Sequence, residues 1–220
     1  MSKLRLLFIK EAQASYISHL DLMRTFQRVF PRAGLSLRHS NGFHPHPIIS
    51  IVLPLPVGQE SDCELLDFET VEQSDGIGVA EALNTGMPAG IRVLACYPIE
   101  RAVKELSFLR ATMELDYDNG VPSGAVERIH ELFTGDEVLV EKRTKHKELA
   151  EINIRPMIQS LTLTEEENML RAEVVVMAQN PGLNPAFIGA AIAKYLPELA
   201  PSFVRVRRHM LYDAEMKEFR

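Results

Sequence analysis

The 220-residue sequence contains no tryptophan and only two cysteines, Cys63 and Cys96. The cysteines lie far apart and form no CxxC pair, so neither a zinc motif nor the motif of an iron–sulfur cluster is present. Two thiols without a pairing pattern are typical of a cytoplasmic protein with reduced cysteines. The cysteines therefore predict no metal site, and we expect no cofactor.

Long apolar runs are also absent. No window approaches the roughly 18 apolar residues of a membrane span, and the apolar run in the opening MSKLRLLFIKEAQ is too short for a signal peptide. The motifs G-x-S-x-G, P-loop and H-E-x-x-H are missing as well. The sequence therefore predicts a cytoplasmic protein without a membrane segment, and it shows no arrangement of a nucleophile and its base.

Charge is distributed unevenly along the chain, whose net charge is −6. Residues 1–50 contain seven Lys and Arg against two Asp and Glu, a surplus of five positive charges, and four histidines. Residues 60–81 contain eight Asp and Glu and no Lys or Arg. Either the basic segment focuses a positive field on one face of the protein, or the two segments are neighbours in the fold and neutralise each other.

Hydrophobic periodicity predicts two halves of similar order. In the first half, alternating apolar residues indicate strands, and a 3.6-residue period indicates two helices. The second half follows the same order, with a hairpin that turns at EEEN. The predicted strands are residues 3–10, 35–39, 48–56, 63–71, 91–99, 110–118, 137–143, 161–178 (as a hairpin) and 203–213, and the helices are 18–30, 78–86, 125–135 and 185–196.

Each half therefore approximates β-α-β-β-α-β, the pattern of ferredoxin-like domains. The predicted fold class is α+β, with two ferredoxin-like halves packed into one body. The first half covers residues 1–107 and the second covers residues 108–220.

The helix at residues 18–30 is the most clearly delimited element. Ser18 and Asp21 form an approximate capping box at its start, and Pro31 should end or kink it, with Gly34 closing it off. The predicted apolar face consists of Leu20, Met23, Phe26, Val29 and Phe30.

The segment RHSNGFHPHP at residues 38–47 follows this helix and contains only one large apolar side chain. Gly42 permits a positive φ angle. His44 and His46 each precede a proline, which favours extended geometry, so the two imidazoles should share one face of a stiff loop. Arg24 and Arg28 lie one turn apart on the preceding helix.

The residues around this loop allow three interpretations. In the first, the arginines bind phosphates and Phe43 stacks on bases, as in a polyanion site for RNA. In the second, His19, Asp21, His44 and His46 hold a divalent metal, although positions 19 and 21 lie on different sides of a helix. In the third, Asp21 pairs with an arginine and the histidines fasten the loop to the helix.

Two blocks, YISHLDLMRTFQRVFPRAGL (16–35) and SNGFHPHPIISIVLPLPVGQESDCELLDFE (40–69), resemble the bacterial radical-SAM-linked proteins, a family with a domain of unknown function. EINIRPMI at 151–158 resembles a further block of that family. The chain departs from the family at His44, which weakens the metal interpretation, and at Pro31, which suggests a local kink. The matching positions are Tyr16, Ser18, His19, Leu20, Asp21, Arg24, Arg32, Ala33, Gly34, Ser40, Gly42, Phe43, Pro45, His46, Pro47, Gly58, Ser61 and Glu64.

The resemblance implies a partner. Members of that family are encoded beside, or fused to, radical-SAM enzymes, which hold a 4Fe–4S cluster through a CxxxCxxC motif. This sequence lacks the motif, so the resemblance implies a non-catalytic or accessory protein that presents tRNA or rRNA to a radical-SAM enzyme. The predicted RNA-binding residues are Arg24, Arg28, Arg38, His39, Asn41, Phe43 and His44, with Lys142, Arg143, Lys145, His146 and Lys147 as an extension.

Two alternatives stay open. The chain could be a metal-independent RNA-processing enzyme in which His46 is the general acid or base, because imidazole titrates near neutrality. His19 and Asp21 would complete that candidate catalytic set as organising residues. The chain could instead be a protein adaptor without RNA contact, docking on its partner through the acidic segment at 60–81.

Overall fold

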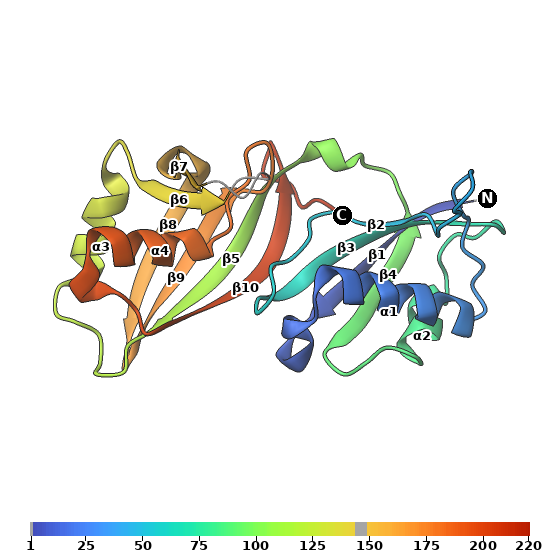
Figure 1. Cartoon of the computed structure of the whole chain (residues 1–220), viewed down its shortest axis with the longest axis horizontal. Helices are drawn as coiled ribbons and strands as arrows, with labels where there is room; N and C mark the ends of the chain where they lie inside the picture. Colours follow the sequence, from blue (N-terminus) through green and yellow to red (C-terminus); the bar gives the residue numbers. More distant parts are fainter. Residues whose placement is uncertain (1, 144–148) are drawn as a thin grey trace. The chain divides into compact units, whose positions relative to one another are not determined.

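The computed structural model describes residues 2–143 and 149–220 and divides the chain into two units. Unit 1 contains Met1–Glu105 together with Glu218–Arg220, and unit 2 contains Leu106–Lys217. Each unit is of the α+β class, with two helices and an antiparallel sheet (Figure 1). Among the described residues, no helix combines the length and the apolar character that a membrane crossing requires.

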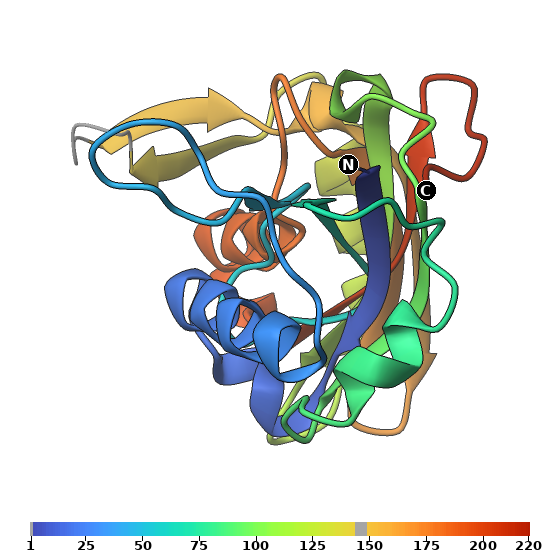
Figure 2. The same ribbon diagram turned by 90° about the vertical axis from the view of Figure 1, so that its right-hand side faces the viewer.

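Unit 1 is built on an antiparallel sheet with the strand order β4-β1-β3-β2. Both helices lie against one face of this sheet (Figures 1 and 2). Aromatic rings from the strands and from α1 pack together there. The rings of Phe8 and Phe26 are 5.1 Å apart, and those of Phe30 and Phe68 are 4.7 Å apart. The elements are β1 (Ser2–Lys10), α1 (His19–Arg32), β2 (Ile49–Ile51), β3 (Glu60–Thr70), α2 (Val79–Asn84) and β4 (Ile91–Pro98).

Helix α1 begins and ends where local sequence signals place its ends. The Ser18 hydroxyl accepts a hydrogen bond from the Asp21 backbone N–H at 3.2 Å, which confirms the predicted N-cap. At the other end, the N–H of Leu35 donates to the carbonyl of Phe30 at 3.0 Å around Gly34, whose φ is +75°. Pro31 lies in the last turn, so the helix ends shortly after it.

Two predictions for unit 1 are wrong. Residues 35–39 form no strand, because only the isolated bridges Leu37–Thr70 and His39–Pro47 occur there. Leu20, assigned to the apolar face of α1, is an exposed side chain in the first turn. Leu22 is buried instead. Periodicity describes the apolar face averaged over the whole helix, whereas burial in the first turn depends on the elements that pack against that turn.

Unit 2 contains an antiparallel sheet with the order β10-β5-β9-β8 and a separate hairpin, β6-β7. The predicted strand at 137–143 exists as β6, but among the described residues it pairs with β7 alone, and β8 takes its expected place in the main sheet. The elements are β5 (Leu106–Asp116), α3 (Ala125–Thr134), β6 (Leu139–Arg143), β7 (Leu149–Asn153), β8 (Ile158–Glu166), β9 (Met169–Met177), α4 (Ala186–Tyr195) and β10 (Phe203–Asp213). Short 3₁₀ turns cover Ala12–Tyr16, Val103–Glu105, Arg155–Met157 and Pro197–Leu199.

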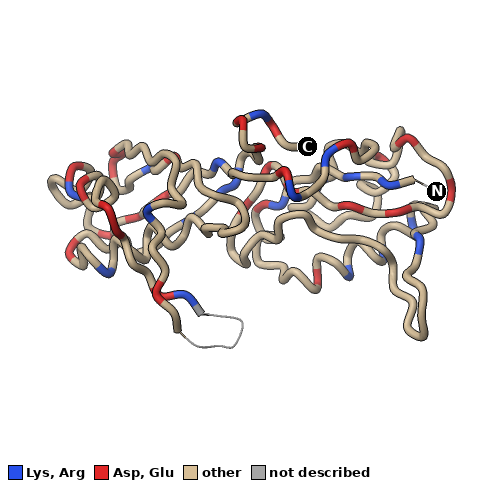
Figure 3. The backbone as a smooth tube through the Cα atoms, turned by 90° about the horizontal axis from the view of Figure 1, so that it is seen from above, with Lys and Arg blue, Asp and Glu red and all other residues tan. Residues whose placement is uncertain are grey.

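The basic and acidic segments of unit 1 are neighbours, because β1 pairs with β3. Arg5 donates to both carboxylate oxygens of Asp67, at 2.6 and 2.9 Å, and Lys3 lies 3.8 Å from Glu69. Figure 3 shows where Lys and Arg and where Asp and Glu lie along the backbone. The second interpretation of the charge pattern is therefore confirmed at these pairs, and much of the positive surplus of residues 1–50 is neutralised within the unit.

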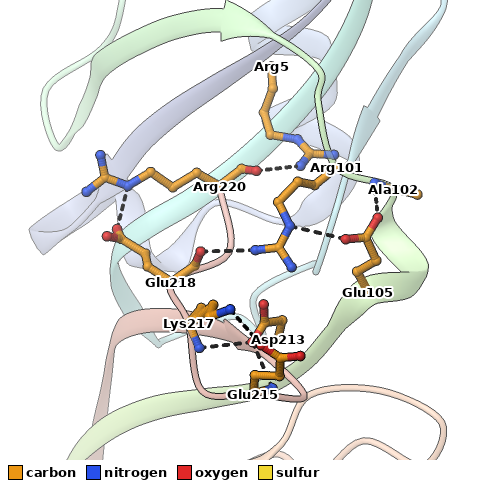
Figure 4. Close-up of polar contacts among 9 residues, drawn as sticks. All are labelled: Arg5, Arg101, Ala102, Glu105, Asp213, Glu215, Lys217, Glu218 and Arg220. Carbon is orange, nitrogen blue, oxygen red and sulfur yellow. Dashed lines mark hydrogen bonds and ion pairs between the residues drawn. The ribbon is translucent and has the colours of Figure 1, made fainter.

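The last three residues of the chain pack against two arginines of unit 1. Arg5, which has no exposed surface, donates to the carbonyl of Arg220 at 3.1 Å, and Arg101 donates to the carbonyl of Glu218 at 3.2 Å (Figure 4). Both guanidinium groups also lie over the ring of Phe219, at 5.1 and 5.2 Å from its centroid. Phe219 is only 2% exposed, so this tail is an integral part of unit 1.

The two cysteines should react slowly. Burial raises the pKa of the Cys96 thiol from its ordinary 9.0 to about 12, and the Asp75 carboxylate adds to the shift. At pH 8 the thiolate fraction of Cys96 should thus be about a thousandfold below that of an unfolded thiol. Cys63 is buried. We expect a chromogenic thiol reagent to label neither cysteine in the folded protein at pH 8 and both in urea; rapid labelling of one thiol would contradict this.

The raised pKa of Cys96 makes the stability of the folded protein depend on pH. Because the folded protein holds the thiol proton more tightly than the unfolded chain, Cys96 contributes stability below pH 9.0. That contribution is lost as the pH rises towards 12.

Candidate functional site

The blocks that suggested a function lie at two places in unit 1. The first place is the end of β1, where the 3₁₀ turn Ala12–Tyr16, the start of α1 and the start of β3 meet. The second place is the loop at residues 38–48, which is fastened to β3. In the part of the chain that the structure describes, the two places have separate sets of contacts.

Lys10 organises the first place. Its ammonium group is buried and donates to the carbonyls of Ser15 and Ile17, both at 3.1 Å. Burial lowers the pKa of this lysine, and the negative charge of Glu64 opposes the shift. Lys10 therefore ties together two carbonyls of the chain just before α1, and so positions the first turn of the helix.

Two matching positions, one just before β3 and one at its start, support the same turn. The N–H of Gly58 donates to the carbonyl of Ser15 at 2.9 Å, and its φ is +86°, a conformation that favours glycine. Ser61 lies opposite Lys10 in the β1–β3 register. Sequence reasoning missed Lys10; the available signal was a lone lysine at the end of the apolar strand segment KLRLLFIK.

Asp21 is occupied by local partners. Its carboxylate accepts hydrogen bonds from the Ser18 hydroxyl at 2.7 Å and from Arg24 at 3.0 Å. The bond from Ser18 first, and then the one from Arg24, hold the pKa of this carboxyl below its usual value. The predicted pairing of Asp21 with an arginine is therefore confirmed. His19 and Arg28 are exposed on the same helix.

The loop at the second place is closed by hydrogen bonds across its base. The N–H of Ser40 donates to the carbonyl of His46 at 2.9 Å, and the N–H of Ile48 donates to the carbonyl of Arg38 at 2.8 Å. The Ser40 hydroxyl accepts from the His46 N–H at 3.2 Å and lies 2.9 Å from the ring Nδ1 of His46. His46 therefore closes the loop on itself through Ser40, whereas the third interpretation had the histidines fasten the loop to the helix, and that part of it is wrong.

The tip of the loop is open to solvent. Phe43 is 102% exposed, that is, fully exposed, and Asn41 and His44 beside it are exposed too. Gly42 has a φ of +124°, which confirms the need for glycine there. Residues 40–47 contain no Asp, Glu, Lys or Arg. The loop thus presents an aromatic ring flanked by an amide and an imidazole on a fastened base.

The arginines and histidines at the edges of the loop have intramolecular partners. Arg38 donates to Glu69 at 2.6 Å, and His39 Nδ1 lies 3.1 Å from the carbonyl of Leu37. Arg38 keeps further N–H donors beyond the one used here. Of the predicted basic extension, Lys142 is exposed on β6, whereas Lys145, His146 and Lys147, together with the side chain of Arg143, lie outside the described residues.

The metal interpretation finds no geometric support in the described residues. Within residues 2–143 and 149–220, no group of three or more His, Cys, Asp or Glu side chains is arranged to hold a metal ion. His46 and Asp21, two of its four predicted ligands, belong to the separate contact groups described above.

Comparisons with known proteins concern the family and the fold. The model of a bacterial family described as "Uncharacterized protein conserved in bacteria (DUF2344)" matches residues 3–185. No curated protein matched the sequence.

Among solved structures, the fold is similar to that of a chain in the "Crystal Structure of a Cbf5-Nop10-Gar1 Complex", with a TM-score of 0.50 and 12% identity. The likeness covers 98% of this chain and 50% of that chain, so this chain spans half of its length. A chain in the "Crystal Structure of an Unknown Protein from Galdieria sulphuraria" has 10% identity and a TM-score of 0.29 over 94% of this chain and 96% of that one. That score is too low for an argument, and the first likeness concerns the fold alone.

Proposed function

This chain belongs to the bacterial family DUF2344, and from this premise we propose that unit 1 binds single-stranded RNA through the loop at residues 40–47. The observation that carries the proposal is the fully exposed ring of Phe43 on a fastened loop. An aromatic ring held in water can stack on any unpaired base, which is worth about 1–3 kcal/mol per base.

The hydrogen-bonded base of the loop favours binding because the loop then loses less conformational entropy when a ligand binds. Ser40 and His46 are already joined across the loop, and Pro45 and Pro47 restrict the backbone between them. A preorganised loop loses little further freedom when a ligand binds. His44 and Asn41, exposed beside the ring, can add hydrogen bonds to base edges.

The phosphate contacts should come from arginines near the loop and on α1. Arg28 is exposed, and we assign it a phosphate contact. Arg24 and Arg38 hold Asp21 and Glu69 with part of their guanidinium groups, and their remaining N–H donors can reach a phosphate. These partners reduce the net attraction, so we expect stacking rather than charge to dominate affinity.

Replacing Phe43 by alanine tests this function. We expect the Kd for a labelled 12-nucleotide RNA, measured by fluorescence anisotropy, to rise by about 5- to 150-fold, because one stacking contact of about 1–3 kcal/mol is lost. The matched control is Phe203→Ala. The Phe203 ring on β10 is 55% exposed, and its removal should leave the Kd unchanged. Equal Kd values for the wild type and Phe43→Ala would exclude the loop as the binding surface.

The same experiment addresses the alternatives. An RNA-processing enzyme would shorten the labelled RNA, and His46→Ala would stop the cleavage while leaving the anisotropy change in place. The contact of His46 with Ser40 supports a structural role instead. A protein adaptor would bind no RNA and would dock on its partner through the acidic segment at 60–81.

We further propose that the protein serves a radical-SAM enzyme, a partnership that rests on the sequence blocks at 16–35 and 40–69. We also assign both units to the ferredoxin-like architecture. The support in unit 1 is the order β-α-β-β-α-β with the sheet order β4-β1-β3-β2. In unit 2, β5, α3, β8, β9, α4 and β10 repeat this arrangement once the β6-β7 hairpin is set apart as an insertion.

A further inference from the structure

A hollow of about 310 Å³ lies in unit 1 beside the base of the loop. Its volume is at the lower end of the range for small-molecule sites, about 300–1,000 Å³. His46 lines it together with β2, β3 and the start of β1. The lining residues that matter here are Lys3, His46, Ser50, Asp67, Glu69 and Ile99.

The polar side chains of the hollow share one face of the sheet. Ser50 lies opposite Asp67, and Lys3 lies opposite Glu69 in the strand registers. Side chains opposite each other or two apart on a strand point to the same face. The neighbouring positions Leu4 and Phe68 belong to the core beneath the helices, so the hollow lies on the face of the sheet away from α1 and α2.

Two carboxylates in this hollow are held in place by buried or half-buried arginines. Arg5 binds both oxygens of Asp67, at 2.6 and 2.9 Å, and Arg38 binds one oxygen of Glu69 at 2.6 Å. An ionised carboxylate has about four lone-pair sites, so acceptor capacity remains on both. The ammonium of Lys3, on a side chain that is 72% exposed, stands 3.8 Å from Glu69 as a donor.

A ligand for this hollow must offer adjacent N–H donors and an acceptor in one plane. Guanine matches, because its Watson–Crick edge carries two neighbouring N–H donors beside a carbonyl oxygen. The carboxylates can accept from the donors and Lys3 can donate to the carbonyl. Uracil has a single N–H between two carbonyls and therefore matches two carboxylates poorly.

The hollow and the ring of Phe43 lie within reach of one RNA strand. Phe43 is three residues from His46, which bounds the hollow, and three residues span at most about 11 Å. We propose that the hollow binds a guanine next to the base that stacks on Phe43, so that the protein selects its RNA by sequence. This inference rests on the proposed function and adds the identity of the base.

The experiment uses four 12-nucleotide RNAs of uridines that carry one G, A, C or U at the centre. The wild-type protein should bind the G-containing RNA about 5- to 150-fold more tightly than the all-uridine RNA. Ser50→Phe fills the hollow and removes no member of an ion pair, and it should bring the four Kd values within about twofold of one another. Ser123→Phe, an equally exposed serine in unit 2, is the matched control and should keep the preference.

A second variant tests the same hollow in case the Ser50→Phe protein does not fold. Lys3→Met removes the proposed donor to the guanine carbonyl, and it should weaken G-containing RNA several-fold more than the other three. Phe43→Ala should weaken all four RNAs by one common factor. If the wild type binds the four RNAs equally, prefers another base, or keeps its preference for G in Ser50→Phe, the hollow is not a guanine site, while the role of Phe43 stands. If the wild type binds none of them, the proposed function itself fails.

Discussion

Replacing Asp67 by alanine is expected to lower the free energy of unfolding by about 3–5 kcal/mol, because the change leaves a buried cation without its counter-ion. Arg5 has no exposed surface, and Asp67 is the group that accepts two of its hydrogen bonds. The backbone oxygen of Arg220 still accepts a third bond from Arg5, but through a single N–H, whereas Asp67 accepts two. Urea unfolding followed by circular dichroism measures the loss.

Two further proteins make this test specific. Glu72→Ala removes an exposed carboxylate just after the same strand and should change the free energy of unfolding by less than about 0.5 kcal/mol. The double variant Arg5→Met with Asp67→Ala removes both charges, and it should be more stable than Asp67→Ala alone. If the double variant is instead the least stable protein, the cost lies in lost packing, and the unpaired charge of Arg5 is not its cause.

Replacing Phe219 by alanine is expected to detach the C-terminal tail from unit 1. The ring is 2% exposed between Arg5 and Arg101, and truncation of a buried phenylalanine costs about 3–5 kcal/mol. Since each 1.4 kcal/mol is a factor of ten, the population with a detached tail should rise by about a hundredfold or more. Trypsin cleavage after Lys217 reports this population.

In the wild-type protein, hydrogen bonds protect the peptide bond after Lys217. The N–H of Lys217 donates to the Asp213 carboxylate at 2.9 Å, and its carbonyl accepts from the Asp213 N–H at 3.0 Å (Figure 4). Phe203→Ala, which truncates an exposed ring, should be cleaved at the wild-type rate. A Phe219→Ala protein that is cleaved no faster than the wild type would show that the backbone bonds of Arg5 and Arg101 alone hold the tail.

Much of the local structure could be predicted because its causes lie within a few residues. The ends of α1 follow from Ser18 and from Gly34 after Pro31, each acting within one helical turn. The need for glycine at position 42 follows from its φ of +124°. Most strands of both units followed from the two-residue period, but residues 35–39 form none, β6 lies outside the main sheet, β7 was not predicted, and the strand expected at 48–56 is only Ile49–Ile51.

The candidate site was only partly predictable. The sequence indicated that residues 38–47 form a stiff loop with little core, and His46 and Ser40 do fasten it. It could not show that Phe43 stands fully in solvent while Arg38 is held by Glu69, because the partners are 31 residues apart. Lys10 escaped notice since a lysine at a strand end is usually exposed, whereas here it is 1% exposed.

The sequence by itself determined the α+β class, the start and end of α1, the glycine at the loop tip and the absence of the known catalytic motifs that we searched for. The tertiary structure decided which charges are neutralised, which apolar side chains stay in water and where the chain end lies. Arg5 meets Arg220 across 215 positions of the sequence, and no local pattern encodes such a contact. Periodicity and capping act within a few residues, while the burial of Lys10, Arg5 and Phe219 depends on strands and a tail that come together only when the whole chain folds.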